Sequence, residues 1–514
     1  MLARLGRRGF VGGAAALSAA SLSGAMRPAL ATSAMGFDDA RHLLSRATFG
    51  GTPEEIEALV PIDFTQAVDR LLSKSRPQTA TPAPGWVNEG LIVLREKRQQ
   101  AQALKADKDG KVVNPAAKMV REEGLELRNW WVGEMLATDQ PLVEKMTLFW
   151  HNHFTSSIQK VRFVPAMYWQ NALFRREALG NFATLLKAVA QDPAMLFYLD
   201  GERSIARQPN ENFARELLEL FTLGEGHYSE ADIKNAARAF TGWSIDRDSG
   251  RFVNHPKQHD EGEKTFLGQT GHFTGEDIIA IVLRHPRTAE TIVEKLWREF
   301  VSMTPDRAEV TRLAGIFRSS GYEMKPVLRA MFLSPAFRDP ANRGALIKSP
   351  VELIVGSVHL LGLPVHDPTQ LVRMMGGLGQ LPFDPPNVKG WPGGESWITT
   401  NTLLLRQQFL RRMVEATSVA SLEPGTMGNR PNRRADRREQ QMPAEQQMMP
   451  SRPIEGRSLR NVTEASLGPT LAGVETDTLV RTLLPRKPID GFDVGAAPGL
   501  VVASAMLDPA YQLK

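Results

Sequence analysis

Two histidines separated by one residue, His151 and His153, form the first of three polar clusters that could support chemistry in this chain of 514 residues. Both imidazoles can reach one metal ion where the backbone is extended or at a helix end, whereas within a helix they point about 200° apart. Imidazole nitrogen suits borderline transition metals, so a divalent transition metal is the cofactor that these residues would hold. The alternative is a pair of hydrogen-bonded histidines packed against the aromatic residues Phe149, Trp150 and Phe154.

The second cluster is the polar face of a predicted helix that follows Asn210. At helical spacing one face is apolar, with Phe213, Leu217, Leu220 and Phe221, and the opposite face carries Asn212 and the charged residues Glu211, Arg215, Glu216 and Glu219. A solvated face explains this pattern, because Glu211 and Arg215 have the favourable i,i+4 order of a helical ion pair. An arginine flanked by three carboxylates also suits a pocket that fixes a substrate, which makes Arg215 and Glu216 candidate catalytic residues.

The third cluster, His259 and Asp260 with Lys264 close behind, falls in a stretch that is predicted to be a loop. A histidine beside an aspartate suits a metal ligand or a general base, and loops often carry functional residues; an exposed polar turn is the alternative. If the clusters converge between packed helices, one site holds three metal ligands and three catalytic residues. The metal ligands would be His151, His153 and His259. The catalytic residues would be Glu216, Arg215 and Asp260. At least two of the histidines would then share one ion or bond the carboxylates.

Helices must position most of these residues, because helix-start signals recur along the chain. Four segments combine an N-cap hydroxyl with a carboxylate three residues later, and they begin at Thr52, Ser229, Thr274 and Ser349. Helical spacing dominates from Asp38 to about Thr417, which predicts a mainly α fold with a large multi-helix body. The exception is residues 243–268, where a turn signal at 248–250 between short extended runs predicts a small β-ribbon, with a further strand at 264–267.

Composition divides the chain into four parts. Residues 1–34 are predicted to be an export signal, 35–422 the helical core, 423–458 a disordered low-complexity insert, and 459–514 a C-terminal helical segment that completes the core. Within the core, residues 76–85 are rich in Pro and Thr and predict a poorly ordered linker.

The export signal has the usual three regions. The pair Arg7-Arg8 precedes Phe10, a weakly apolar run follows, and small residues allow cleavage after Ala31 or Ala34. Paired arginines mark the twin-arginine route, which carries folded proteins across the bacterial inner membrane, so we expect a periplasmic or secreted protein. No other apolar run approaches the roughly eighteen residues of a membrane helix, so no span is expected once the signal is removed.

Composition also excludes several classes of function. The chain has no cysteine, which rules out disulfides, thiolate metal sites and thiol nucleophiles. Its formal net charge is +5, but residues 1–37 and 425–460 contribute +4 each, which leaves about −3 for the rest. A basic face for nucleic acid is therefore not expected.

Several stretches together are characteristic of one family. They are residues 41–50, 150–154, 210–217, 239–243, His259-Asp260 with Lys264, and 385–394. In these stretches the chain resembles the uncharacterised bacterial family catalogued as domain of unknown function 1800. The resemblance implies an exported, largely helical protein that is often encoded beside a phosphatase- or sulfatase-like exported protein, which is a candidate partner. It implies no reaction.

Two functions of different classes follow from these observations. One is a metal-dependent periplasmic enzyme with the His/Glu/Asp site described above, since export in the folded state allows a cofactor to be loaded before transport. The other is a non-catalytic accessory or binding protein for a cell-envelope partner or polymer. In that case a binding cleft could be lined by Trp130, Trp131, Trp391 and Trp397, although core packing also explains these residues.

Overall fold

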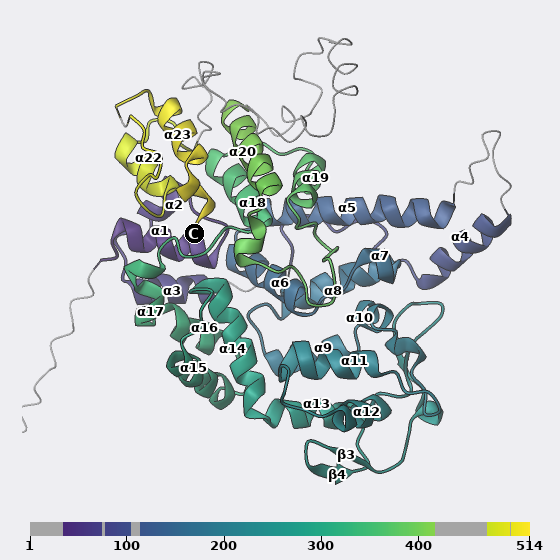
Figure 1. The fold of residues 1–514 in the computed structure, drawn as a ribbon. Helices are drawn as coiled ribbons and strands as arrows, with labels where there is room; N and C mark the ends of the chain where they lie inside the picture. Colours follow the sequence, from purple (N-terminus) through teal and green to yellow (C-terminus); the bar gives the residue numbers. More distant parts are fainter. Residues whose placement is uncertain (1–33, 74–77, 104–113, 417–469, 494) are drawn as a thin grey trace, which may run out of the picture. The chain divides into compact units, whose positions relative to one another are not determined.

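Helices form most of the chain in the computed structural model, which describes residues 34–73, 78–103, 114–416, 470–493 and 495–514. Residues 34–514 belong to one compact unit (Figure 1). The predicted signal up to residue 33 and the predicted insert 423–458 lie outside the described residues. The mainly α fold that helical spacing predicts is confirmed.

The N-terminal half of the unit contains the following α-helices: α1 (Phe37–Ala47), α2 (Pro53–Glu57), α3 (Phe64–Ser73), α4 (Leu91–Ala103), α5 (Pro115–Ala137), α6 (Pro141–His153), α7 (Ile158–Val161), α8 (Val164–Arg176), α9 (Phe182–Ala190), α10 (Pro193–Tyr198), α11 (Glu211–Glu216) and α12 (Glu230–Ala239). The C-terminal half contains α13 (Gly275–Arg284), α14 (Pro286–Phe300), α15 (Arg307–Ser319), α16 (Met324–Phe332), α17 (Pro335–Arg338), α18 (Pro350–Leu361), α19 (Thr369–Gly377), α20 (Thr400–Glu415), α22 (Thr476–Leu483) and α23 (Pro498–Leu507).

The four predicted capping signals all start helices. The hydroxyls of Thr52, Ser229, Thr274 and Ser349 accept a backbone N–H at the starts of α2, α12, α13 and α18, and in each case the carboxylate three residues later accepts the N–H of the cap. These reciprocal bonds satisfy N–H groups that have no partner within the helix, which is why the sequence pattern is a reliable signal.

Helix α6 is buried along almost its whole length and packs against α8 and α1. Four of its polar residues, Glu144, Lys145, His151 and His153, are each at most 3% exposed. Burial of an unpartnered polar group lowers the stability of the fold, so the polar groups of α6 need hydrogen-bond and ion-pair partners from other helices. The cavity beside His153 and the network around Glu144, both described below, contain residues of this helix.

The predicted β-ribbon is present and longer than expected. Strand β1 (Trp243–Ile245) pairs antiparallel with β2 (Phe252–Asn254), with Ser244 opposite Val253, and the predicted turn joins them. Strand β3 (Lys264–Phe266) pairs with β4 (Gln269–Gly271), which the sequence analysis did not predict. The two residues between β3 and β4, Leu267 and Gly268, both have positive φ, as a tight two-residue hairpin requires.

The helix after Asn210 departs from the predicted wheel. It is α-helical only to Glu216 and continues as a π-helix, η2 (Leu217–Thr222). Leu218 is buried and Leu220 is half-buried, whereas the predicted wheel places Leu220 in the core. A π-helix is rare and frequently marks a functional site.

The predicted linker has no regular structure, but its described part is held in place. The carboxylate of Glu134 on α5 accepts the backbone N–H groups of Ala80 (2.8 Å) and Thr81 (2.9 Å) and the Thr81 hydroxyl (2.7 Å). A carboxylate distant in sequence thus supplies bonds that the local sequence lacks, which the prediction of a poorly ordered linker did not include.

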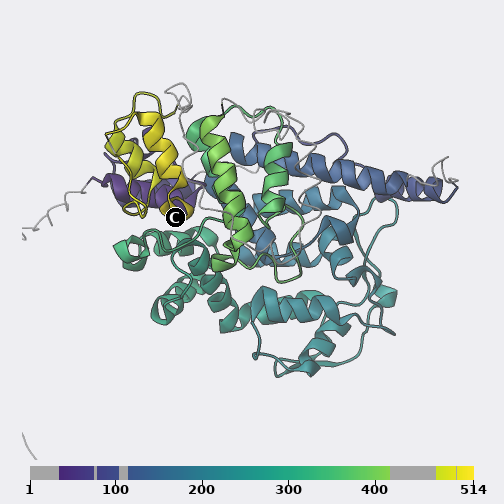
Figure 2. The same ribbon diagram turned by 45° about the horizontal axis from the view of Figure 1, so that its top comes forward.

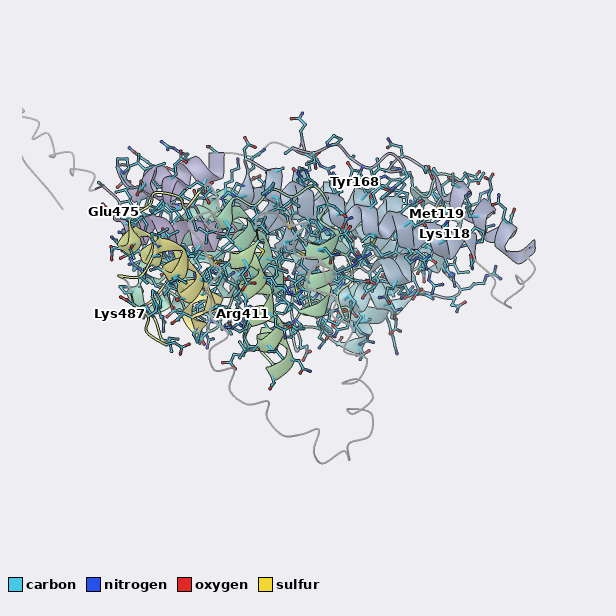
Figure 3. All side chains as sticks on the ribbon, turned by 90° about the horizontal axis from the view of Figure 1, so that it is seen from above. Lys118, Met119, Tyr168, Arg411, Glu475 and Lys487 are labelled. Atoms are coloured by element: carbon cyan, nitrogen blue, oxygen red, sulfur yellow. The ribbon has the colours of Figure 1, made fainter. Side chains whose placement is uncertain are left out.

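The ends of the described unit come together. Helices α22 and α23 lie beside α1 and α2, and the contact of α2 with α22 joins segments about 400 residues apart (Figures 1 and 2). Lys118 and Met119 of α5 lie at the opposite end of the view from Glu475 and Lys487 (Figure 3). None of the described helices combines the length and the apolar character that crossing a membrane requires.

Candidate functional site

A cavity of about 300 Å³ lies where α6, α14 and the loop before α20 meet. Its walls come from the end of α6 (Leu148, Phe149, Asn152, His153), from α14 and the loop after it (Lys295, Arg298, Glu299, Met303), from the start of α18 and its approach (Leu346, Ile347, Ser349, Glu352), and from Gln380, Lys389, residues 391–394, Trp397 and Lys514. This volume is at the lower end of the range for small-molecule sites.

His153, the last residue of α6, is the histidine that borders this cavity. Its Nδ1 atom lies 2.9 Å from the Nζ atom of Lys295, whose ammonium group donates the hydrogen bond. The proton of the neutral ring is therefore on Nε2. That atom is buried, and its contact with the backbone of Phe221 falls short of a well-formed hydrogen bond. Burial and the charge of Lys295 hold the pKa of His153 well below its usual value, and the backbone of Phe221 opposes this shift in part.

Lys295 is positioned by the π-helix. Its ammonium group donates a second hydrogen bond, of 2.7 Å, to the carbonyl of Leu220 in η2. Burial, followed by the nearby charge of Arg298, lowers the pKa of Lys295 to about 8. Among the described residues no carboxylate forms an ion pair with Lys295 or Arg298, so both positive charges are available to a ligand.

The loop before α20 is fastened to α6 through Asn152. Its Oδ1 atom accepts the backbone N–H of Trp391 at 2.7 Å, and its Nδ2 atom donates to the Trp391 carbonyl at 3.4 Å. Gly390 has φ +85°, and a Cβ atom on it would lie 2.3 Å from Asn152 Oδ1. Only glycine fits this close approach. The loop brings the indole of Trp391 to the cavity, and its Nε1 atom is buried without a partner among the described residues.

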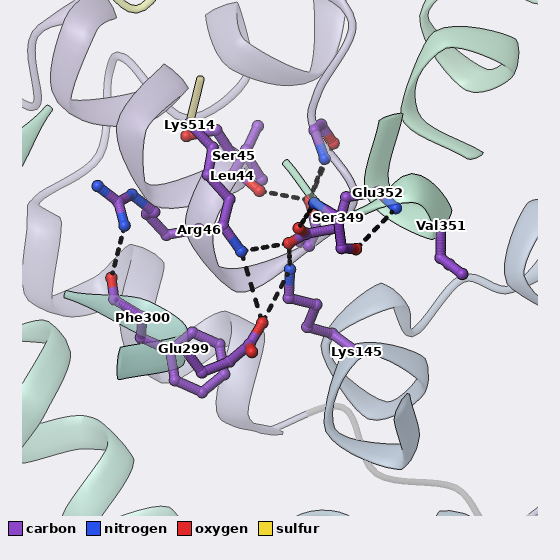
Figure 4. Close-up of polar contacts among 12 residues, drawn as sticks. Leu44, Ser45, Arg46, Lys145, Glu299, Phe300, Ser349, Val351, Glu352 and Lys514 are labelled. Carbon is purple, nitrogen blue, oxygen red and sulfur yellow. Dashed lines mark hydrogen bonds and ion pairs between the residues drawn. The ribbon is translucent and has the colours of Figure 1, made fainter. Parts of the chain in front are cut away.

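One wall of the cavity is a network of two lysines and two glutamates (Figure 4). Lys145 and Lys514 both pair with Glu352, and they lie 3.4 and 3.5 Å from Glu299. Burial alone would raise the pKa of Glu299, but the two ammonium groups lower it to about 2. Two amines face two carboxylates, and burial followed by the charge of Lys514 lowers the pKa of Lys145 well below its usual value, so the network adds no net positive charge. It therefore leaves Lys295 and Arg298 as the excess charge of the cavity, since Lys389 at its rim faces Glu219 (3.7 Å) and Glu225 (3.5 Å).

His151 has a different environment, although it is only two residues from His153. The Arg175 guanidinium binds Glu144 through two hydrogen bonds of 2.5 and 2.9 Å, and it donates to Asn171 Oδ1 at 2.7 Å. The amide of Asn171 therefore donates to His151 Nε2 at 3.0 Å, and the Trp131 indole completes the group by donating to Glu144 at 2.9 Å. Burial and then the charge of Arg175 lower the pKa of His151 well below its usual value. We call these five residues the Glu144 network.

Arg215 and Glu216 form no hydrogen bond or ion pair with either histidine among the described residues. Arg215 binds Glu230 at 2.8 Å and Glu211 at 3.3 Å, and the Glu211 pair is the predicted i,i+4 contact. Burial raises the pKa of Glu216, and Glu219 adds to the shift, while Lys389 opposes it. Glu216 thus acts on the rim of the cavity through charge, and Arg215 belongs to a surface ion pair.

His259 and Asp260 fasten the β-ribbon to the end of α12. Asp260 binds the Arg238 guanidinium through bonds of 2.7 and 3.1 Å, and its N–H donates to the Thr241 hydroxyl at 2.8 Å. The Nδ1 atom of His259 donates to the Thr241 carbonyl at 3.0 Å. The bond to Arg238 lowers the pKa of Asp260. These bonds hold the β-ribbon against the end of α12, which is a structural role.

The six residues predicted from the sequence are therefore not gathered at one point. His153 borders the cavity and Glu216 influences its rim, while His151, Arg215, His259 and Asp260 have other hydrogen-bond and ion-pair partners. Within the described ranges, no group of three or more histidine, aspartate and glutamate side chains is placed to hold a metal ion. Helical geometry is the reason for the two histidines of α6, since residues two apart point to different sides of a helix.

A larger hollow of about 870 Å³ between α4, α5 and α7 is a weaker candidate. The described residues that line it include arginines but neither a histidine nor a carboxylate. The unpartnered buried N–H groups of His153 and Trp391 instead distinguish the cavity beside α14.

Comparison with known proteins gives a family without an assigned activity. The sequence model of the family described as "Protein of unknown function (DUF1800)" matches residues 42–513. No curated protein and no solved structure matches the chain.

Proposed function

The chain belongs to the DUF1800 family, and on that premise we propose that it is an exported protein that binds an anionic ligand in the cavity beside His153. The observation that carries the proposal is the excess of donors and positive charge at this cavity. Lys295 and Arg298 have no carboxylate partner among the described residues. Two buried N–H groups, on His153 and Trp391, make no well-formed hydrogen bond there, and the His153 group has only the backbone of Phe221 beside it. Unpaired donors beside unpaired cations favour an anion that accepts hydrogen bonds.

The lining also indicates what else the ligand contains. Phe149, Met303 and Trp397 contribute apolar surface next to the polar groups. A pocket with apolar walls and few polar groups orients a ligand through its charged end and packs against the rest of it. A ligand with one carboxylate, phosphate or sulfate group on a ring-shaped or apolar body fits this description. Acidic sugar units of a cell-envelope polymer belong to this class.

The export route and the partner expected from the family resemblance agree with this class of ligand. The pair Arg7-Arg8 predicts delivery to the cell envelope, where such polymers occur. A phosphatase- or sulfatase-like partner would act on esters of the same anionic groups. We therefore place the protein in the periplasm or outside the cell, with a binding or accessory role toward an anionic envelope component.

Isothermal titration calorimetry tests the proposal with protein purified after native export. Uronic acids, sugar phosphates and sulfated sugars are titrated against neutral sugars of matched size. Binding of an anionic series that weakens as salt rises supports the proposal. Arg298→Met should weaken that binding about tenfold, whereas Arg307→Met, an exposed arginine of α15 away from the cavity, should leave it unchanged.

Two results would overturn the proposal. The first is equal binding of neutral and anionic sugars, or binding that Arg298→Met does not affect. The second is a stoichiometric transition metal in the exported protein, which would instead support the metal-dependent enzyme predicted from the sequence.

Export has its own test, because the twin-arginine receptor recognises both guanidinium groups and not charge alone. Arg7→Lys combined with Arg8→Lys should leave the precursor in the cytoplasm, as fractionation and immunoblotting will show. Arg4→Lys is the matched control and should be exported normally. Periplasmic appearance of the double variant would contradict the assignment of the signal.

A further inference from the structure

A second and smaller cavity, of about 50 Å³, shares Glu352 and Lys514 with the first. Its other polar walls are Arg41 on α1, Lys348 before α18, Ser357 on α18, Thr482 on α22 and Tyr511. The volume exceeds the 10–15 Å³ or so that one water molecule requires, so the cavity is large enough for a small ligand.

The charges around this cavity are not balanced. Glu352 is the carboxylate in its lining, and this group already pairs with Lys145 and Lys514 and accepts the backbone N–H of Ser349 at 2.7 Å. Arg41 has only a long hydrogen bond of 3.4 Å, to the carbonyl of Pro485, and the Nζ atom of Lys348 lies 3.8 Å from the centre of the Tyr511 ring. The positive charges of Arg41 and Lys348 thus have no anion of their own in the cavity.

Two donors at the cavity are buried without partners. The Nε atom of Arg41 and the hydroxyl of Thr482 make no hydrogen bond among the described residues, and the two residues are 6% and 9% exposed. The hydroxyl of Tyr511 is occupied, since it lies 2.9 Å from that of Ser357. The cavity therefore combines unsatisfied N–H and O–H groups with unsatisfied positive charge, which is the reverse of what a cation or a neutral apolar ligand requires.

We infer that this second cavity binds a small oxyanion, namely a phosphate, sulfate or carboxylate group held by Arg41, Lys348 and Thr482. The site is distinct from the cavity beside His153, and it does not depend on the function proposed for that cavity. It is too small for the ring-bearing ligand proposed there.

Binding should depend on pH in a defined direction. Burial lowers the pKa of Lys348 to about 7, and Arg41, Arg406 and Lys514 contribute to the shift. The groups that face Lys348 are thus Arg41 from α1, Arg406 from α20, the Glu352–Lys514 pair and the Tyr511 ring. Because a bound anion favours the protonated amine, affinity should be highest below pH 7 and should fall as the pH rises above it.

The experiment is titration of inorganic phosphate, sulfate and acetate into the full exported protein at pH 6 and pH 8.5. Phosphorus NMR and calorimetry follow the phosphate arm, and the relative affinities of the three ions identify the preferred oxyanion. Lys348→Met should weaken binding at least tenfold and abolish its pH dependence, and Thr482→Val should weaken it less. Lys348→Arg keeps the charge and should retain most of the affinity.

Two controls separate this site from the first cavity. Arg298→Met changes only the first cavity and should leave binding of the small oxyanion unchanged, and Arg307→Met changes neither. Absence of binding by all three ions overturns the inference. So does binding that is lost in Arg298→Met but kept in Lys348→Met and Thr482→Val, since the oxyanion would then occupy the first cavity. If Lys348→Met does not fold, Thr482→Val and Lys348→Arg still decide between these outcomes.

Discussion

His151 and His153 are two residues apart on one buried helix, yet the structure gives them opposite surroundings. His151 belongs to the Glu144 network, where each donor meets an acceptor and the charge of Glu144 is matched by that of Arg175. His153 borders a cavity where donors exceed acceptors and positive charges exceed negative ones. Burial is the same for both histidines. The difference is whether the surrounding donors and charges already have partners within the protein. They do in the Glu144 network, whereas at the cavity beside His153 a ligand could supply the missing acceptors and negative charge.

Breaking the Glu144 network should produce the largest effect on stability. Arg175→Met leaves the Glu144 carboxylate buried without its cation, and loss of one partner of a buried pair costs about 3–5 kcal/mol. Chemical denaturation measures the free energy of unfolding. Arg176→Met is the matched control, because its side chain is 54% exposed, and it should change that free energy by no more than about 0.5 kcal/mol. Equal losses in the two variants would show that the network does not stabilise the fold.

The glycine that fastens the cavity loop gives the next largest effect. Gly390→Ala should lower the free energy of unfolding by the strain of a positive φ, about 1–2 kcal/mol, and by about 1–3 kcal/mol more for the overlap with Asn152. Gly379→Ala isolates the first contribution, since Gly379 has φ +93° and open space around it. A loss in Gly390→Ala no greater than in Gly379→Ala would contradict the close approach of loop and helix.

Substitution of each histidine in turn tests the comparison directly. His151→Gln should lower the free energy of unfolding by about 1–3 kcal/mol and leave the affinity for the anionic ligand unchanged. His153→Gln should weaken that affinity about tenfold and affect stability less, because the amide oxygen of glutamine can still accept the hydrogen bond from Lys295. Denaturation and calorimetry on the same two proteins provide both measurements. The comparison fails if His151→Gln weakens binding as much as His153→Gln does.

A further expected effect is a dependence on pH. The pKa of Lys295 is lowered to about 8 in the folded protein, so the unfolded chain binds more protons between pH 8 and the normal lysine pKa of about 10.4. Stability should therefore rise with pH across that window. Affinity for the anion should fall across it by a few-fold, because Lys295 loses its charge. Lys295→Met should remove both trends, and their persistence in that variant would assign them to another group.

The sequence predicted the local parts of this structure better than the distant ones. Capping boxes and the β1–β2 hairpin depend on residues close together in the chain, and these predictions are confirmed. The π-helix was not predicted, because a hydrophobic wheel assumes α-helical spacing throughout. The hydrogen bonds between Glu134 and the linker were also not predicted, since the donors are more than 50 residues away in the sequence.

The candidate site was predicted only in part for the same physical reason. His153 was predicted as a metal ligand from its spacing to His151, and residues 385–394 were noted for their likeness to the family. The partners that give His153 its role are far away in sequence, with Lys295 at 142 residues and the Lys145–Glu352 pair separated by 207. Lys295 and Arg298 lie on an ordinary amphipathic helix and carry no local signal. The convergence of six residues was an assumption about packing that residue types and spacing do not determine.

The carboxylate of Glu352 lies in the walls of both cavities, and this position would link the two proposed ligands thermodynamically. An anion that draws Lys514 towards itself on one side weakens the pair with Glu352 and changes the electrostatic potential on the other. Linkage requires the effect to be reciprocal: whatever factor the small oxyanion imposes on the affinity of the larger ligand, the larger ligand imposes on the oxyanion. Through this one buried side chain, occupancy of one cavity would change the ligand affinity of the other.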